Sequence, residues 1–416
     1  MDYKVKDIGL SEGGRLRVEW ALDHMPVLAK LRKEYGPKKP LEGYRIGGAI
    51  HVTKETASLI HTLRELGAEV SWCGCNPLST QDDVAASLAE DGISVFAWRG
   101  LSEEQYYWCI DRVCKTKPHF TMDDGADLVF WIHEKLPRLI SGVVGGTEET
   151  TTGVKRLKNM ARDGALRYPI IAVNNAQTKQ DFDNVYGTAQ GTMDAIMRAT
   201  SVMIAGQTVV VAGYGHCGRG VAMRAHGMGA DVIVTEVNPI YALQAAMNGF
   251  RVMSMDDAIE QGDIFITATG CKSIITRNHF PRLKDGAILV NVGHFDVEVR
   301  VDQLEEYALE KTEIRPNTEQ FLLPGRRKVY LIAQGRLANL GAAEGHPSGV
   351  MDLSFSNQVL ALIELSRGKF TEPGVYEISR EQDERIAQDK LEAMGISIDS
   401  LTEEQDAYLR GWKEGT

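Results

Sequence analysis

A lysine and an aspartate four residues apart are the first side chains in this sequence that could do chemistry. The segment VNNAQTKQDFDN, residues 173–184, contains Lys179 and Asp183 together with three asparagines. If a helix runs through this segment, the ammonium and the carboxylate lie on the same face of it. An exposed Lys–Asp pair is usually a surface ion pair that contributes little to stability. A functional interpretation of this pair therefore needs further features of the sequence.

Polar side chains recur where apolar segments of the N-terminal half end. Segments such as YRIGGAIHVT and YPIIAVNNAQT are typical of strands, and helical stretches such as KETASLIHTLRELG separate most of them. This alternation predicts an α/β fold with doubly wound, mostly parallel sheets. Ligands bind beyond the carboxyl ends of the strands in such sheets. Each polar residue at these ends could be a helix cap or a turn residue, but we expect one cleft to gather His51, Thr53, Asp124, Glu148, Glu149, Asn174 and Lys179.

A glycine-rich turn in the second half of the chain is the strongest binding motif. An apolar strand precedes Gly213-x-Gly215-x-x-Gly218, a helical segment follows it, and Glu236 ends the next strand. Gly213 allows a tight turn, Gly215 lets the backbone approach a pyrophosphate, and Gly218 permits close packing of helix on strand. A carboxylate at position 236 accepts hydrogen bonds from ribose hydroxyls and disfavours the 2′-phosphate of NADP. The motif therefore predicts a Rossmann domain that binds NAD.

Length and charge exclude several classes of protein. A chain of 416 residues is long enough for two or three domains, and 43% hydrophobic with 25% charged residues is typical of a globular protein. A net charge of −11 argues against nucleic acid or an anionic membrane as partner. The N-terminal sequence has no apolar run like that of a signal peptide, and no window approaches transmembrane length. We therefore expect a cytoplasmic protein.

The spacing of cysteines and histidines gives no sign of a metal site. Cys73 and Cys75 are two residues apart, and Cys109 and Cys114 are five apart, so neither pair has the C-x-x-C spacing. The ten histidines form no H-E-x-x-H motif. We therefore expect no metal, and buried free thiols rather than ligands.

The segments divide the chain into domains. We expect a substrate-binding domain at 1–185, a Rossmann NAD-binding domain at 186–346, and a C-terminal oligomerisation tail at 379–416. The apolar helix VMDLSFSNQVLALIELSRG has no place in a minimal dinucleotide domain, so we expect residues 347–378 to return to the first domain. Two crossings between domains form a hinge, which suits an enzyme that closes on its substrate. A helical tail often clasps a partner subunit.

A collinear series of segments resembles one enzyme family over nearly the whole chain. The segments are HVTKETA, NPLSTQDD, DDGADL, EETTTGV, TKQDFDNVYGT, VVVAGYGHCGRG, VTEVNP, NVGHFDVE and GRLANLGAAEGHPS. Together they are similar to S-adenosylhomocysteine hydrolase. The resemblance implies tightly held NAD, a homotetramer, and reversible cleavage of S-adenosyl-L-homocysteine to adenosine and L-homocysteine, a reaction of the methyl cycle in one-carbon metabolism.

The chemistry implied by this resemblance has no net redox change. Oxidation of the ribose 3′-hydroxyl to a ketone acidifies the hydrogen on C4′, and a base removes it. Homocysteine thiolate then leaves from C5′, water adds to the resulting enone, and the ketone is reduced again. A thioether is a poor leaving group without such activation, which explains why a hydrolase needs a dehydrogenase cofactor.

The resemblance also implies residue roles. Lys179 assists deprotonation of the 3′-hydroxyl with Glu149 close by, and Asp183 binds a ribose hydroxyl. A carboxylate stabilises the charged form of a lysine, so burial and the positive ring of the cofactor must oppose it. Asp124 and His51 are candidates for proton transfer at C4′ and for handling water and thiolate at C5′. The implied catalytic set is His51, Asp124, Glu149, Lys179, Asp183 and His294.

Two further sets are implied for binding. The substrate-binding set consists of Thr53, Glu55, Gln81, Asp124, Glu149, Lys179, Asp183 and His346. The cofactor-binding set consists of Thr150, Thr151, Thr152, Asn184, Gly213, Gly215, His216, Cys217, Gly218, Arg219, Gly220, Glu236, Thr269, Gly270, Val292, Gly293, His294 and Asn339. Thr53 and Glu55 match the edge that binds adenine, and His346 with Phe295 resembles the gate of the substrate channel.

Three positions depart from the family pattern. Thr188 occupies a position that is often Cys, so a thiol cannot be required there for tuning the cofactor. Glu344 replaces a common Met beside the substrate gate. The chain ends in GWKEGT and lacks a Lys- and Tyr-containing tail that contacts NAD in a neighbouring subunit, so NAD binding could be weaker. Short ends of this kind resemble archaeal and thermophilic bacterial members.

Three alternatives compete with this interpretation. Some short-tailed relatives prefer S-inosyl-L-homocysteine, but hypoxanthine presents a carbonyl oxygen where Glu55 could accept a hydrogen bond from the amino group of adenine. We therefore favour adenine. A non-catalytic NAD-binding relative should have lost catalytic residues, yet Lys179, Asp183 and Asp124 are present. A dehydrogenase of small hydroxy acids would explain the Rossmann motif but not HVTKET or EETTTG.

Overall fold

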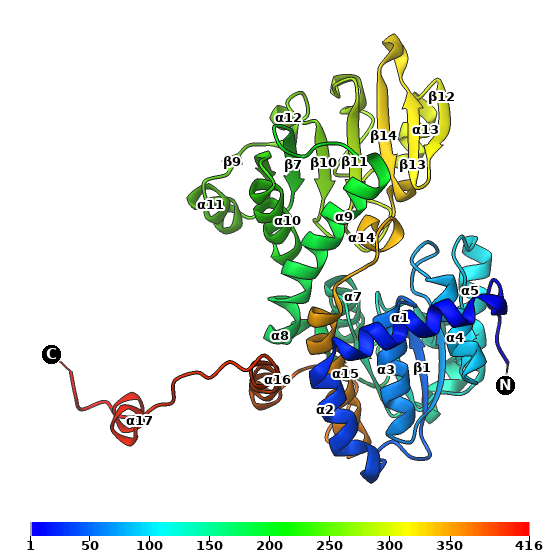
Figure 1. The fold of residues 1–416 in the computed structure, drawn as a ribbon, viewed down its shortest axis with the longest axis vertical. Helices are drawn as coiled ribbons and strands as arrows, with labels where there is room; N and C mark the ends of the chain where they lie inside the picture. Colours follow the sequence, from blue (N-terminus) through cyan, green and yellow to red (C-terminus); the bar gives the residue numbers. More distant parts are fainter. Residues whose placement is uncertain (1, 416) are drawn as a thin grey trace.

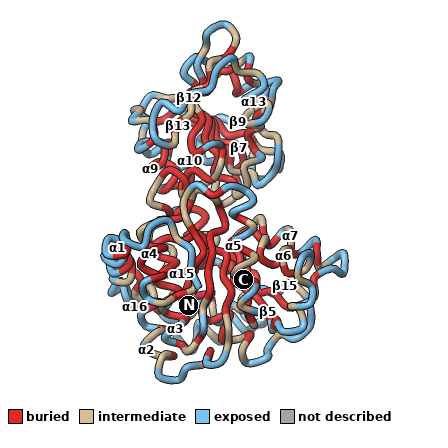
Figure 2. The backbone as a smooth tube through the Cα atoms, turned by 90° about the vertical axis from the view of Figure 1, so that its right-hand side faces the viewer, coloured by how far each residue is buried: buried red, intermediate tan, exposed pale blue. Residues whose placement is uncertain are grey.

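Two separate sheets organise the computed structural model, which describes residues 2–415 (Figure 1). The first sheet has the strand order β15-β6-β5-β4-β1-β2-β3, and the second has the order β12-β13-β14-β11-β10-β7-β8-β9. Helices cover both sheets, and the buried residues concentrate around the strands of each (Figure 2). The predicted α/β fold with two doubly wound parallel sheets is confirmed.

All strands of the first sheet run parallel to their neighbours. They are β1 (Arg45–Ala49), β2 (Glu69–Cys73), β3 (Ser94–Phe96), β4 (Phe120–Asp123), β5 (Gly145–Glu148), β6 (Pro169–Ala172) and β15 (Gly374–Glu377). The helices around them include α1 (Ser11–Asp23), α2 (Pro26–Tyr35), α3 (Lys54–Glu65), α4 (Asp82–Glu90), α5 (Glu103–Lys115), α6 (Asp127–Lys135) and α7 (Thr151–Arg162). Gly48 in β1 makes room for the buried ring of Trp72, because a Cβ there would lie 2.2 Å from that ring.

The second sheet has a parallel body and an antiparallel edge. Its parallel strands are β7 (Thr208–Ala212), β8 (Asp231–Thr235), β9 (Arg251–Val252), β10 (Ile264–Thr267), β11 (Ala287–Asn291) and β14 (Lys328–Ile332). The edge strands β12 (Glu310–Arg315) and β13 (Thr318–Leu322) complete it, and α9 (Thr188–Thr200), α10 (His216–Gly227), α11 (Pro239–Met247), α12 (Met255–Ala258) and α13 (Val301–Tyr307) surround it. The strand order reverses between β7 and β10, as it does between β1 and β4 in the first sheet. Ligands bind at such switch points.

The chain returns to the first sheet after α14 (Ala338–Gly341). Helix α15 (Ser348–Ser366) is buried along most of its length, and β15 then pairs with β6 in parallel. Although α15 is largely apolar, it contains the buried polar residues Asp352, Ser354 and Gln358. No helix within residues 2–415 combines the length and the hydropathy needed to cross a membrane.

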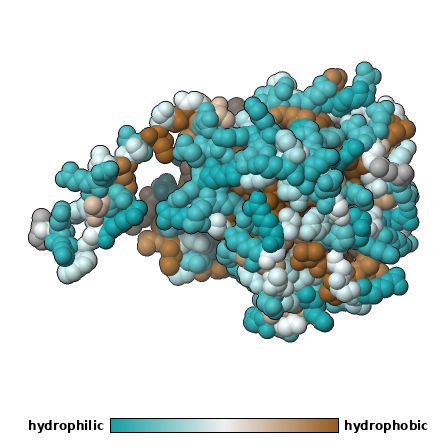
Figure 3. Space-filling view, turned by 90° about the horizontal axis from the view of Figure 1, so that it is seen from below, coloured by the Kyte–Doolittle hydropathy of each residue, from teal (hydrophilic) through white to brown (hydrophobic). Residues whose placement is uncertain are grey.

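The C-terminal segment, residues 379–415, consists of a packed helix and an extended part. Helix α16 (Arg380–Ala393) packs on the first domain through the buried Ile386. Its Asp383 accepts hydrogen bonds from the backbone N–H groups of Gln177 at 2.5 Å and Thr178 at 2.9 Å, which begin the short helix α8 (Gln177–Gln180). Helix α17 (Glu403–Arg410) instead extends away from the rest of the chain (Figures 1 and 3). Within residues 379–415, the part that follows α16 is therefore extended.

Candidate active site

Most of the residues that the sequence predicts for the site line one cavity of about 870 Å³. Residues from both sheets line it, including those that follow β1, β4, β5, β6, β7 and β11. The predicted residues among its lining are His51, Thr53, Glu55, Asp124, Glu149, Thr150, Thr151, Thr152, Lys179, Asp183, Asn184, Gly213, Gly215, His216, Cys217, Glu236, Thr269, Gly270, Val292, Gly293, His294, Asn339 and His346. The volume falls in the range of small-molecule sites.

Two predicted glycines pack helix α10 instead of lining the cavity. A Cβ on Gly218 would lie 1.9 Å from the carbonyl oxygen of Gly213, and a Cβ on Gly220 would lie 2.1 Å from that of Val185. Both glycines therefore allow close contact between α10 and a neighbouring backbone segment. Gly218 has the packing function expected for the third glycine of the motif.

Gln81 and Arg219 also lie outside the cavity lining. The amide oxygen of Gln81 accepts a hydrogen bond from the Lys54 N–H at 3.0 Å, and its amide nitrogen donates to the Glu344 carbonyl at 3.0 Å. Gln81 thus joins the start of α3 to the segment before α15. Arg219 faces Asp181, with 3.9 Å between the charged atoms.

The Lys–Asp pair is buried. Lys179 in α8 is 4% exposed, and its Nζ lies 2.9 Å from Asp183 Oδ2 and 3.8 Å from Glu149 Oε1. The same ammonium donates a hydrogen bond to Asn184 Oδ1 at 2.6 Å. A π-helical turn at Asp183–Gly187 follows α8 and presents Asp183 and Asn184 to the lysine. This arrangement differs from the solvent-screened surface pair that the spacing alone would suggest.

Charge pairing dominates the titration of this pair. Burial lowers the pKa of Lys179, but the carboxylates of Asp183 and Glu149 more than offset burial, so the pKa lies above its ordinary value. Burial raises the pKa of Asp183, yet His346 and Lys179 together hold that pKa well below its usual range. In this state the pair is therefore an ammonium and a carboxylate.

Glu149 is the cavity carboxylate that can change its charge near neutral pH. It follows β5, and two residues of α15 hold it: the Ser354 hydroxyl donates to Oε1, and the Gln358 amide donates to Oε2 at 2.6 Å. Burial raises the pKa of Glu149 to about 7, although Lys179 and the two hydrogen bonds act in the opposite direction. A carboxyl group with this pKa is suited to accept and return a proton.

His51, Asp124 and His294 form a second polar cluster in the cavity. His51 Nε2 lies 3.4 Å from Asp124 Oδ2, and His294 Nδ1 lies 3.7 Å from Asp124 Oδ1. Burial lowers the pKa of His51 to about 3 and also lowers that of His294, while burial raises the pKa of Asp124. Both imidazoles are therefore neutral at neutral pH.

His346 links the Lys–Asp pair to the second domain. Its Nδ1 lies 2.5 Å from Asp183 Oδ1, and its Nε2 lies 2.6 Å from the Asn339 amide nitrogen. Because that amide nitrogen donates to Nε2, the ring proton is on Nδ1 and is donated to Asp183. Phe295, expected beside His346, does not line the cavity, and its ring packs on His294 with a centroid distance of 4.6 Å.

The glycine-rich turn has the features of a dinucleotide site. Gly213 has a φ of +95°, and a Cβ on Gly215 would meet only open space. Helix α10 begins directly after Gly215 without a side-chain cap, so its first N–H groups are available to an anion. Glu236 accepts backbone hydrogen bonds from Tyr214 at 2.6 Å and Val237 at 2.7 Å, which fix its carboxylate at the cavity wall. These residues fit a bound NAD.

Glu55 also lines the cavity and is almost fully buried. Its Oε1 accepts a hydrogen bond from the Ser348 hydroxyl at 2.7 Å and lies 3.2 Å from Lys54 Nζ. Within residues 2–415, Oε2 accepts no hydrogen bond. Thr53 caps α3 by accepting from the Thr56 N–H at 3.4 Å, which fixes the helix start that carries Glu55.

Sequence reasoning missed the supporting residues on α15. Ser348, Ser354 and Gln358 hold Glu55 and Glu149 from the helix that the sequence predicts only to return to the first domain. The available signal was the placement of polar residues inside the apolar stretch VMDLSFSNQVLALIELS. Buried polar groups need partners, so such residues indicate contacts with other polar groups.

The pKa of Glu149 predicts a specific pH dependence of stability. Its folded-state pKa of about 7 lies above the usual 4.5, so the folded protein binds the proton more tightly than the unfolded chain. This contribution is fully present below the usual pKa and is lost as the pH rises through the folded-state value. We expect the free energy of unfolding of wild type, relative to Glu149→Gln, to fall by roughly 2–3 kcal/mol between pH 4.5 and pH 8. Urea denaturation at both pH values measures this, and an unchanged difference would contradict it.

Comparison with known proteins agrees with this geometry. The family model described as S-adenosyl-L-homocysteine hydrolase matches residues 2–138, and the NAD binding domain of the same family matches residues 184–345. An adenosylhomocysteinase from Aeropyrum pernix is 55% identical over 99% of both chains, and one from Sulfurisphaera tokodaii is 56% identical over 100% of both. An S-inosyl-L-homocysteine hydrolase from Methanopyrus kandleri is 52% identical over 100% of this chain and 98% of its own. This chain therefore belongs to the S-adenosyl-L-homocysteine hydrolase family, with NAD as its cofactor.

Proposed function

We propose that this chain cleaves S-adenosyl-L-homocysteine reversibly to adenosine and L-homocysteine through transient oxidation at C3′ of the ribose. The observation that carries the proposal is the buried cluster of Lys179, Asp183 and Glu149. This cluster lines the same cavity as the glycine-rich turn and as Glu55. A nucleoside that spans the cavity would therefore have its ribose hydroxyls between charged groups that can bind them and move a proton.

Lys179 and Glu149 are proposed to act together on the 3′-hydroxyl. When bound, NAD supplies the hydride acceptor for C3′ and a positive ring that opposes the charge on Lys179. The Lys179 ammonium holds the hydroxyl oxygen, and Glu149, only 3.8 Å away with a pKa of about 7, accepts the proton that leaves. Asp183 stays ionised and binds the neighbouring ribose hydroxyl. The proton returns by the same route when the ketone is reduced.

The second cluster is proposed to act at C4′ and C5′. Asp124, whose pKa is raised by burial, removes the C4′ proton after oxidation. His51 and His294 are neutral and lie against this carboxylate, where they can pass the proton that Asp124 has taken on to the departing thiolate and orient the water that replaces it. The two clusters thus divide the proton transfers of one reaction between them.

The remaining predicted residues are proposed to bind NAD. Gly213, Gly215 and the first N–H groups of α10 would hold the pyrophosphate, and Glu236 would bind the adenosine ribose. Further members of the set line the same cavity: Thr150, Thr151, Thr152, Asn184, His216, Cys217, Thr269, Gly270, Val292, Gly293, His294 and Asn339. Gly218 and Gly220 contribute through the packing of α10.

We propose that the enzyme acts as a homotetramer in the cytoplasm. Support for assembly comes from the extended C-terminal segment, where Tyr408, Leu409 and Trp412 are exposed apolar side chains. Trp412 is 86% exposed within one chain, which is unusual for a side chain that stabilises proteins chiefly when buried. The net charge of −11 gives no attraction to nucleic acid.

The first test concerns Lys179. We expect Lys179→Ala to bind NAD but to slow the adenosine-dependent rise in NADH absorbance by about 10²–10⁴-fold, because the 3′-hydroxyl loses the ammonium that holds its oxygen while Glu149 accepts the proton. Stopped-flow absorbance of the NAD-loaded enzyme measures this step directly, and a thermal unfolding scan shows whether the variant is folded. The matched control is Lys158→Ala, whose ammonium pairs with Glu377 on the surface. A wild-type rate in folded Lys179→Ala would refute the role of this lysine.

The second test concerns the purine base of the substrate. Adenosylhomocysteinases and an S-inosyl-L-homocysteine hydrolase are both similar to this chain. Oε2 of Glu55 is free to accept a hydrogen bond from the amino group of adenine, whereas the oxygen of hypoxanthine would face it as a second acceptor. Such a mismatch in a buried site costs about 10⁴-fold in kcat/KM. We expect thiol release from S-adenosyl-L-homocysteine to exceed that from the inosyl compound by this order, and Glu55→Gln to narrow the gap. Equal kcat/KM values for the two substrates would refute this role of Glu55, and a higher value for the inosyl compound would favour the inosyl alternative.

A further inference from the structure

An ammonium group lies beside the carboxylate that is proposed to bind the purine base. Lys54 Nζ is 3.2 Å from Oε1 of Glu55, and the side chain of Lys54 is only 13% exposed. Glu55 lines the cavity, whereas Lys54 does not. The ammonium therefore meets Glu55 at the oxygen that Ser348 also binds. The oxygen proposed to accept from adenine is the other one, Oε2.

A lysine in this position can change which base the cavity accepts. Its ammonium has three N–H donors, and its side chain is flexible. If the ammonium moved onto Oε2 of Glu55, it would occupy the acceptor that the amino group of adenine needs. The same N–H groups could instead donate to the carbonyl oxygen of hypoxanthine. A preference for adenine therefore requires a second interaction that keeps Lys54 away from Oε2.

Glu344 provides that second interaction. Its Oε2 lies 3.4 Å from Lys54 Nζ, nearly the same distance as Oε1 of Glu55. Gln81 joins the two backbones, because it accepts from the Lys54 N–H and donates to the Glu344 carbonyl. In the described part of the chain, Lys54 forms ion pairs with Glu55 and Glu344 alone. The ammonium thus lies between two carboxylates, and its attraction to Glu344 opposes any further movement onto Glu55.

Two arginines hold Glu344 in place. Arg17 of α1 donates to Glu344 Oε2 at 2.7 Å, and Arg198 of α9 donates to Oε1 at 3.5 Å. Arg17 is itself bound to Asp83 at 3.0 and 3.1 Å. Burial raises the pKa of Glu344, but Arg17 and Lys54 more than offset burial, so this pKa lies below its usual range. Glu344 is therefore charged at neutral pH and is fixed between helices that surround different sheets.

We propose that Glu344 is a specificity-determining residue for the purine base, because it binds Lys54 and so leaves Oε2 of Glu55 free for an amino group. This role rests on the proposed function, which places the base at Glu55. The Met that is common at this position in the family is uncharged and would not hold an ammonium. A neutral residue at position 344 would leave Glu55 as the carboxylate partner of Lys54.

Two nucleosides that cannot be oxidised measure recognition of the base without chemistry. 3′-Deoxyadenosine and 3′-deoxyinosine lack the hydroxyl that is proposed to react, and they differ only in the base. Titration calorimetry of the NAD-loaded full chain gives a Kd for each, and the ratio of the two Kd values is the discrimination. We expect Glu344→Gln, which keeps the size but not the charge, to lower the discrimination by about 5–10-fold, since the ion pair is partly exposed. Glu344→Asp retains the charge and should retain most of the discrimination.

Lys54 tests how Glu344 acts. Lys54→Met removes the ammonium and preserves the length of the side chain. In this background we expect Glu344→Gln to leave the discrimination unaltered, because no ammonium remains to be restrained. A merely structural role for Glu344 would instead produce the same change with and without Lys54.

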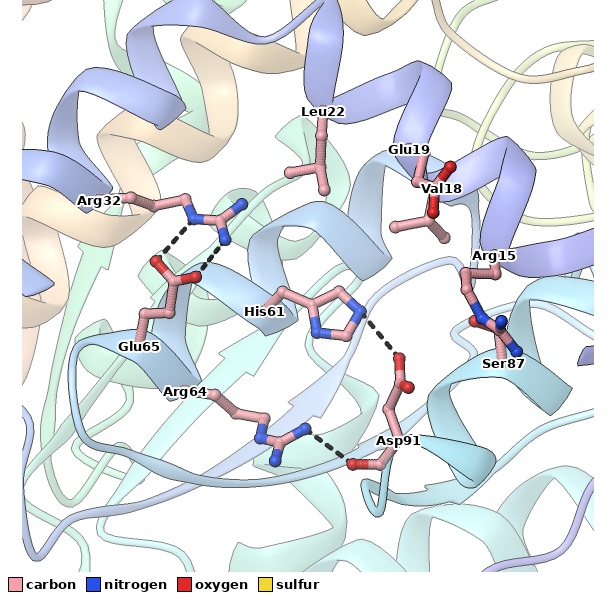
Figure 4. A pocket seen from close by; sticks show the side chains of 10 residues that line it. All are labelled: Arg15, Val18, Glu19, Leu22, Arg32, His61, Arg64, Glu65, Ser87 and Asp91. Carbon is pink, nitrogen blue, oxygen red and sulfur yellow. Dashed lines mark hydrogen bonds and ion pairs between the residues drawn. The ribbon is translucent and has the colours of Figure 1, made fainter. Parts of the chain in front are cut away.

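Glu65 supplies the matched control on the same helix. It ends α3, the helix that begins at Lys54, and it accepts a hydrogen bond from Arg32 at 2.9 Å in a surface pocket (Figure 4). The side chain of Glu65 is 49% exposed, close to the 46% of Glu344. We expect Glu65→Gln to discriminate between the two nucleosides like wild type.

The outcomes separate the role of Glu344 from the proposed function. Wild type that binds neither nucleoside, or binds both equally, would refute the placement of the base at Glu55 and the role of Glu344 with it. Wild type that prefers 3′-deoxyadenosine supports that placement. If the same preference survives in Glu344→Gln, or if this change weakens both nucleosides equally, the role of Glu344 is overturned while the proposed function stands.

Discussion

Lys179 is 4% exposed and positively charged, so the protein must supply negative charge within a few ångströms of it. An unpaired ammonium in such a position would cost several kcal/mol. Asp183 at 2.9 Å and Glu149 at 3.8 Å meet this requirement, but each then needs support of its own. His346 binds Asp183 from the segment that leaves the second domain, and α15 binds Glu149. The return of the chain to the first sheet is therefore part of the site as well as of the fold.

The carboxyl groups that line the cavity differ in their pKa values because their immediate neighbours differ. Lys179 and His346 keep Asp183 ionised, whereas burial raises the pKa of Glu149 to about 7 and raises that of Asp124. Groups whose pKa values are separated in this way can perform different proton transfers at one pH. This separation explains how one cavity can serve both an oxidation at C3′ and an elimination across C4′ and C5′.

Much of the fold and the site could be predicted from local patterns. The glycine-rich turn and the polar residues after each apolar strand are short-range signals, and the geometry of parallel sheets brings their positions to one edge. The sequence could not reveal that α15 holds Glu149 through Ser354 and Gln358, because these contacts join residues about two hundred positions apart. The approach of His294 to Asp124 depends on how the two domains meet, which no spacing in the sequence encodes.

The central claim is that the thioether is cleaved after activation at C3′ and not by direct displacement at C5′. The most direct measurement is to run the reaction in D₂O and to locate deuterium in the recovered adenosine. Removal of the C4′ proton and addition of water place a solvent hydrogen at C4′, while the hydrogen at C3′ leaves and returns with the cofactor. The account predicts deuterium at C4′ and the original hydrogen at C3′. Adenosine that retains its original C4′ hydrogen after complete turnover would show direct displacement and contradict the account.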